Sequence, residues 1–101
     1  MYWNDNDRSA PKTPWGPAQS QKTLAPGIHF FSTAGHGGIQ VEKLGDVPAK
    51  VRKVAGIRYQ GLKGLWFEED CAVLPLLHAL PHLGGTVTLS NVLDYYPEYK
   101  A

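Results

Sequence analysis

Apolar and polar residues alternate most clearly in two short segments of the first half of the chain. Residues 28–33 are β-branched and aromatic, and residues 38–42 alternate apolar with polar side chains. The glycine-rich stretch between them is typical of a tight hairpin loop in which glycine adopts positive φ. We therefore predict a β-hairpin over about residues 28–42, and the pattern leaves open which of its faces is buried.

Helical spacing of apolar residues follows the hairpin in residues 46–56. Asp46 is the expected N-cap and Gly56 the expected stop. The apolar stripe of this helix consists of Val47, Val51 and Val54. The glycine-containing residues 57–65 predict a loop or a weak, short strand.

A second helix is predicted from about Glu68 to Leu80. Its first turn would carry acidic residues that complement the helix dipole, and Cys71 would lie on its apolar face. Pro75 should kink this helix and Pro81 should end it. Residues 86–89 predict an extended segment, after which Ser90 would cap a last short helix.

These elements predict an α+β fold in which a short antiparallel sheet, built on the 28–42 hairpin, is packed by two or three short helices. Residues 1–13 are polar and predict a flexible N-terminal arm, unless Tyr2 or Trp3 docks onto the domain. Residues 14–101 would form a single domain that begins with a turn anchored by Trp15.

The composition of the 101 residues fits a globular domain, with 43% hydrophobic and 19% charged residues. A formal net charge of +1 argues against a bulk acidic DNA mimic and against a strongly basic nucleic-acid binder. The single cysteine excludes an internal disulfide. Because no apolar run resembles a signal peptide or a membrane span, we expect a soluble cytoplasmic protein.

Candidate chemistry is concentrated in residues 32–38 and 66–71. A thiol-dependent enzyme would pair Cys71 with His36, oriented by a carboxylate such as Glu68. A buried structural cysteine explains Cys71 more simply, and no oxyanion motif accompanies it. The carboxylate run Glu68, Glu69 and Asp70 is explained by the start of a helix or by an acidic recognition spot.

Metal and phosphate sites are not expected from these segments. The metal-ligating residue types, His36, Cys71, His78 and His82, lack the paired close spacing of structural zinc sites. The glycines of residues 35–38 lack the strand-to-helix context and the Lys-Ser/Thr ending of a phosphate loop. We expect no cofactor.

Six of the ten basic residues lie between positions 43 and 63, where Asp46 is the only acid. Aromatic residues are interleaved with them, so nucleic-acid contact through this segment is a weaker alternative. A basic segment next to an acidic run also suits docking to a protein partner. The binding residues expected on this basis are Lys50, Arg52, Lys53, Arg58, Trp66, Glu68, Glu69 and Asp70.

Several blocks resemble a family of small uncharacterised bacterial proteins that also occur on plasmids and phages. The blocks are Thr-Pro-Trp-Gly-Pro-Ala-Gln-Ser at 13–20, Ser-Thr-Ala-Gly-His-Gly-Gly at 32–38, Trp-Phe-Glu-Glu-Asp-Cys at 66–71 and the tyrosine-rich ending at 94–99. The resemblance implies no reaction. By analogy with small accessory proteins of mobile elements, it implies a non-enzymatic module that binds a host protein complex. An inhibitor of host defence, such as an anti-CRISPR protein, fits this expectation.

Overall fold

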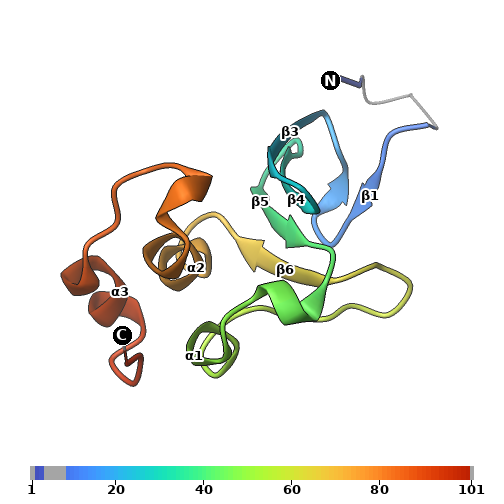
Figure 1. Cartoon of the computed structure of the whole chain (residues 1–101). Coiled ribbons are helices and arrows are strands. Elements are labelled where there is room, and N and C mark those ends of the chain that lie inside the picture. The colour runs from blue at the N-terminus through green and yellow to red at the C-terminus, as the bar shows by residue number, and fades with distance from the viewer. Residues whose placement is uncertain (1, 4–8, 101) are drawn as a thin grey trace.

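The computed structural model describes residues 2–3 and 9–100. Its strands form two antiparallel sheets, and the helices lie together at the end of the molecule away from the N-terminus (Figure 1). This arrangement confirms the predicted α+β class. The strands are β1 (Lys12–Thr13), β2 (Gly16–Pro17), β3 (Ser20–Ala25), β4 (Ile28–Ser32), β5 (Gly37–Val41) and β6 (Leu65–Glu68). The helical elements are η1 (Leu44–Asp46), α1 (Ala49–Arg52), α2 (Val73–Ala79), η2 (Pro81–Leu83) and α3 (Leu89–Tyr95).

The larger sheet has the strand order β3-β4-β5-β6, and its centre is the predicted hairpin of β4 and β5. The alternation of residues 28–33 and 38–42 was therefore interpreted correctly. β3 was not predicted, because Ser20–Ala25 is mostly polar and small and gives little strand signal. It becomes a strand by pairing antiparallel with β4.

Both faces of this sheet are covered, which answers the question that the pattern left open. Ile39 pairs with Phe67 on one face, which packs against the helices, and the next pair, Gln40 and Trp66, lies on the other. We call these the helix face and the aromatic face. The aromatic face is covered by a second cluster built on Ala18, Phe31 and Trp66.

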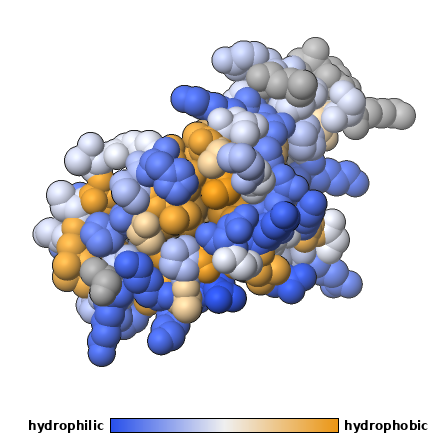
Figure 2. Space-filling model, viewed as in Figure 1, coloured by the Kyte–Doolittle hydropathy of each residue, from blue (hydrophilic) through white to orange (hydrophobic). Residues whose placement is uncertain are grey.

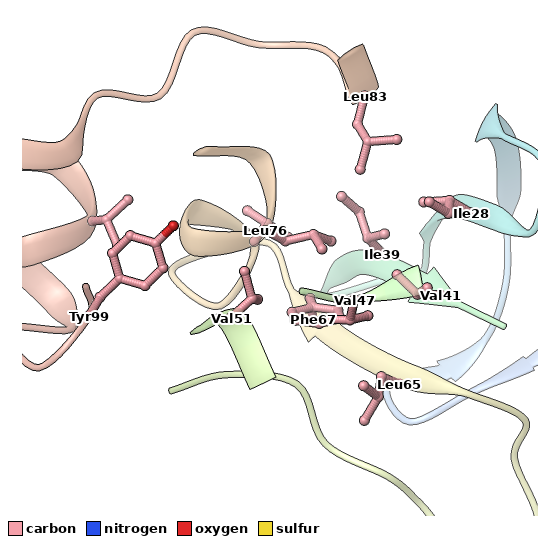
Figure 3. Packing of buried hydrophobic residues seen from close by; sticks show 12 residues of the cluster. Ile28, Ile39, Val41, Val47, Val51, Leu65, Phe67, Leu76, Leu83 and Tyr99 are labelled. Carbon is pink, nitrogen blue, oxygen red and sulfur yellow. The ribbon is translucent and has the colours of Figure 1, made fainter. Parts of the chain in front are cut away.

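The main core lies between the helix face and helices α1 and α2. Phe67 of β6 and Leu76 of α2 are completely buried and point toward Ile39 and Val41 of β5 (Figure 3). Val51 of α1 is also completely buried in this cluster. Each such side chain contributes roughly 1.5–3 kcal/mol of hydrophobic stabilisation. Tyr99 extends the core to the C-terminal end, where its hydroxyl lies 3.1 Å from Nδ1 of His78.

The first predicted helix is shorter than expected. Residues 46–56 form only the four residues of α1, which begins after Pro48, and Asp46 belongs to η1 and does not cap α1. Pro48 begins a helix readily because its missing N–H is not needed there. The expected apolar stripe is confirmed, since Val47 and Val51 are buried.

The second helix begins later in the structure than the sequence predicts. Leu65–Glu68 is the strand β6, and α2 starts only at Val73. Leu65, Trp66 and Phe67 are strong strand formers, and pairing with β5 outweighs the helix-start signal of the acidic residues. Pro75 consequently falls in the first turn of α2, where its N–H has no intrahelical partner, and it needs no kink.

The last helix is capped by Thr88 rather than by the predicted Ser90, and it begins at Leu89. The Thr88 side chain accepts from the backbone N–H of Asn91, and the Asn91 side chain accepts from the N–H of Thr88. This reciprocal cap fixes the start of α3. Of the strand or extended segment predicted at 86–89, Leu89 belongs to α3, and residues 86–88 form no strand, although Thr88 is extended.

The N-terminal residues are described only in part. Tyr2 forms a β-bridge with Ser20, and the Trp3 N–H donates to the carbonyl of Gln19 at 2.8 Å. Trp3 also packs against the aromatic cluster. Residues 4–8 of the predicted arm lie outside the described residues, and the division into an arm and a domain stays a prediction.

The length of the helices and the distribution of apolar residues on the surface both bear on function. No helix among the described residues is long and apolar enough to cross a membrane. Figure 2 shows that hydrophobic residues gather in the middle of one face, where the helices meet the sheet. A groove lined by Leu24, Phe30, Ile39, Leu77 and Leu83 lies between the helix face and α2.

The glycines of residues 35–38 have a different role from the one predicted. None of them adopts positive φ, so the loop conformation does not require them. At Gly38, a Cβ would overlap the Trp15 indole and the carbonyl oxygen of Phe67. Trp15 is placed there by the β1–β2 turn, in which Thr13 accepts from the Trp15 N–H and donates to the carbonyl of Gly16. The close packing of Trp15 on the strand therefore requires glycine at position 38.

The first prediction concerns this contact. Gly38→Ala should lower the free energy of unfolding by about 1–3 kcal/mol, because the added methyl must displace Trp15 or the β6 backbone. Gly35→Ala is the matched control, since a Cβ there meets nothing within 4 Å. Urea unfolding of both variants measures the difference. Equal stability of the two variants would contradict the role assigned to Gly38.

Polar side chains at the opposite end of the β4–β5 hairpin form a small network. The Glu42 carboxylate lies 2.7 Å from Nε2 of His29 and 2.9 Å from Nζ of Lys63. The Lys63 hydrogen bond, followed by the His29 hydrogen bond, holds the pKa of Glu42 below its ordinary value of 4.5. Lys63 thus connects the loop before β6 to the end of β5.

The second prediction follows from this lowered pKa. The ionised Glu42 stabilises the fold above its unfolded-state pKa, and that stabilisation is lost as the pH falls through the folded-state value. Glu42→Gln should therefore be less stable than the wild type at pH 7, by a difference that shrinks in acid. Urea unfolding between pH 7 and pH 3 measures it. The exposed Asp94 supplies the control variant Asp94→Asn, which leaves both contacts of Glu42 in place and should keep the pH dependence that Glu42 gives the wild type.

Candidate functional site

The two chemistry-rich segments of the sequence are neighbours in the fold. Gly38 pairs directly with Glu68 across β5 and β6, and the Glu69 N–H donates to the carbonyl of Gly37 at 2.9 Å. The turn that carries His36 is thereby fixed against the end of β6. The juxtaposition arises from strand pairing, which the sequence blocks by themselves did not indicate.

A cavity of about 330 Å³ lies beside β6, within the usual size range of ligand sites. Its lining joins residues from the β1–β2 turn, the end of α1, the 53–59 loop, β6 and the start of the α2 region. The lining residues that bear charge, a thiol or an aromatic ring are Trp15, Arg52, Lys53, Tyr59, Trp66, Glu68, Cys71 and Tyr96. We call this hollow the Trp66 cavity.

Aromatic side chains form much of the wall of the Trp66 cavity. The Trp66 ring meets Trp15 edge-on, with centroids 5.9 Å apart, and lies 5.7 Å from the ring of Phe31. Trp66 is 97% buried, yet its Nε1 has no hydrogen-bond partner among the described residues. A buried donor without an acceptor costs roughly 1–3 kcal/mol. This N–H group is itself buried, so it is a feature of the packing behind the cavity wall.

Charge is unevenly distributed around the Trp66 cavity. Arg52 and Lys53 are exposed at the end of α1, and Glu68 is half-buried in β6. Within the described part of the chain, no ion pair joins Glu68 to either cation. The two cations consequently remain available to an acidic ligand.

Cys71 lies in the turn before α2, half-buried in the wall of the cavity. The Tyr96 hydroxyl donates to its sulfur at 3.7 Å. Burial, then the contact with Cys71, raises the pKa of Tyr96 to about 12. The thiol thus contacts a weak acid that stays protonated at neutral pH and supplies no general base.

His36 lies away from the Trp66 cavity and next to two carboxylates. It is exposed at the β4–β5 turn and is not among the residues that line the Trp66 cavity. The ligand-type atoms of His36, Glu68 and Asp70 all lie within 4.8 Å of one another. The dyad of His36 and Cys71 stays a prediction, and the described hydrogen-bond partner of Cys71 is Tyr96.

The other predicted binding residues are spread over several surfaces. Lys50 and Lys53 line a second, smaller hollow with Glu98 and Lys100. Arg58 is exposed and lines none of the three hollows described here. Glu69, one residue after Glu68, lies instead at the apolar groove beside α2. The acidic run is therefore divided between two surfaces.

Five candidate residues named from the sequence line the Trp66 cavity, but part of the wall was missed. The five are Arg52, Lys53, Trp66, Glu68 and Cys71. Tyr96 belongs to the tyrosine-rich ending, so its aromatic character was a usable signal. Ile57 reaches the wall through a β-bridge with Trp66. Nothing in the local sequence indicates that long-range pairing.

The structure is a small α+β domain with a cavity of mixed aromatic and charged lining. Residues 8–100 match the family model described as a domain of unknown function, DUF7007, and the chain belongs to this family. This confirms the expected membership of an uncharacterised family. No curated protein and no solved structure matches the chain.

The third prediction tests the contact between Tyr96 and Cys71. Cys71→Ala should lower the pKa of Tyr96 below about 12, because the hydrogen bond and the charge interaction with Cys71 both raise it. Phenolate absorbance between pH 8 and pH 13 measures the shift. Tyr96→Phe should remove the contribution of Tyr96 to this transition, whereas Tyr95→Phe should leave it in place because the hydroxyl that contacts Cys71 belongs to Tyr96. An unchanged titration in Cys71→Ala would refute the contact.

Proposed function

We propose that the protein is a non-enzymatic protein-binding module and that the Trp66 cavity receives an anchor side chain of the partner. The observation that carries this proposal is that Arg52, Lys53 and Trp66 converge on one hollow. Aromatic and arginine residues in a concave site are typical of binding hot spots. A partner segment with an apolar anchor flanked by carboxylates would match both the aromatic wall and the two cations.

The exposure of Arg52 and Lys53 supports the same proposal. Neither cation forms an ion pair with Glu68 among the described residues, so both would attract an acidic partner to the cavity. Catalysis receives less support, because Cys71 contacts Tyr96 and not a described base.

The narrower form of the proposal is that the protein comes from a mobile element and inhibits a host defence complex in the manner of an anti-CRISPR protein. It rests on the resemblance of the sequence blocks and on analogy with small accessory proteins. Identification of the partner captured from bacterial lysate tests this narrower form of the proposal.

The fourth prediction concerns the two cations at the cavity, Arg52 and Lys53. It is tested by capturing the partner from bacterial lysate with the wild type and with matched charge variants. Arg52→Glu combined with Lys53→Glu should lose the partner, because reversed charges at the cavity repel an acidic segment. Lys22→Glu should retain it, since Lys22 is exposed outside the Trp66 cavity. Circular dichroism establishes that both variants are folded.

The outcomes of this experiment are distinct. No stable partner at low salt, or equal capture by all variants, would contradict the proposal. Recovery of nucleic acid with a steep salt dependence would favour the nucleic-acid alternative. A bound protein partner should also slow the alkylation of Cys71, because the thiol lies in the wall that the anchor covers. Substrate turnover that Cys71→Ala abolishes would establish the thiol-dependent enzyme instead.

A further inference from the structure

A second group of chemically active side chains lies where the β4–β5 turn meets the end of β6. It consists of the imidazole of His36 and the carboxylates of Glu68 and Asp70, with their ligand-type atoms within 4.8 Å of one another. The three residues come from two segments that are about 30 positions apart in the sequence. Their approach is therefore a property of the fold.

The backbone that carries these residues is held by hydrogen bonds on both sides. The Thr33 hydroxyl accepts from the His36 N–H at 3.1 Å and donates to the His36 carbonyl at 2.8 Å. Thr33 itself is buried. Pairing of Gly38 with Glu68 fixes the neighbouring strand end. The Cα positions are thus set by rigid elements, while the exposed side chains of His36 and Asp70 can still change rotamer.

The negative charge of this group is not neutralised by a basic side chain. Among residues 2–3 and 9–100, no lysine or arginine forms an ion pair with Glu68 or Asp70. Lys63, which does form an ion pair, binds Glu42 at the other end of the hairpin. Two carboxylates beside an imidazole, without a cation, form a site that a metal ion would complete.

We propose that His36, Glu68 and Asp70 bind a divalent first-row transition metal, with Zn²⁺ as the representative ion. One imidazole nitrogen and two carboxylate oxygens suit such ions, whereas the imidazole disfavours calcium and magnesium. Donor atoms at about 2.1 Å from a tetrahedral ion lie roughly 3.4 Å apart. Separations of up to 4.8 Å therefore require a closure of about 1.4 Å at most, which rotamer changes of exposed side chains supply.

Three protein ligands leave at least one coordination position for water or for a donor from a bound molecule. Structural zinc sites have four protein ligands, so the geometry points to an open site rather than to a structural one. The proposal does not rest on the protein-binding function, although one member of the group, Glu68, also lines the Trp66 cavity.

Calorimetric titration of the metal-free full chain with ZnCl₂, with any histidine tag removed, tests this site. The wild type should bind one ion, and His36→Ala and Asp70→Asn should each weaken binding at least about tenfold. Two matched controls should remain close to the wild type. His82→Ala removes another exposed histidine, and Glu69→Gln removes the neighbouring carboxylate that lies outside the group.

Co²⁺ absorption spectra of the same proteins provide a second readout that reports the ligand types. A spectrum without a thiolate charge-transfer band, unchanged in Cys71→Ser, is expected. A thiolate band that disappears in Cys71→Ser would overturn the proposed ligand set. No binding of Zn²⁺ by the wild type, or equal losses in His36→Ala and His82→Ala, would overturn the site altogether.

Discussion

The close packing of Trp15 on Gly38 is the constraint on which the rest of the structure depends. The absence of a side chain at position 38 leaves room for both the Trp15 ring and the Phe67 carbonyl of β6, which a Cβ there would overlap. The indole then covers the aromatic face beside Trp66 and forms part of the cavity wall. A single backbone position thus sets the thickness of the aromatic layer and the location of the candidate site.

Strand geometry explains why the acidic run does not act as one patch. Consecutive residues of a strand point to opposite faces, so Glu68 belongs to the aromatic side and Glu69 to the groove beside α2. Asp70, beyond the strand, lies close to both Glu68 and His36. The acidic run is therefore divided, with Glu68 and Asp70 on one side and Glu69 at the groove.

The fold class and the central hairpin could be predicted from the sequence because strand alternation is a local signal. Leu65–Glu68 could not, because its acidic neighbours resemble a helix start and only pairing with β5 makes it a strand. The same error displaced the start of α2 and gave Pro75 a kink that its place in the first turn makes unnecessary. Loop glycines were misread for a related reason, since the steric demand at Gly38 comes from Trp15, more than twenty residues earlier in the chain. Five cavity residues were recognised by type, but their convergence on one hollow depends on tertiary contacts.

The two proposed sites share one side chain, Glu68, which lines the Trp66 cavity and belongs to the group with His36 and Asp70. A cation bound to Glu68 would cancel the negative charge in the cavity wall and leave Arg52 and Lys53 as its dominant charges. An acidic partner would then bind more tightly, and by thermodynamic linkage the partner would tighten metal binding by the same factor. Equal affinity for the partner with and without the bound metal would mean that the two sites do not communicate through Glu68.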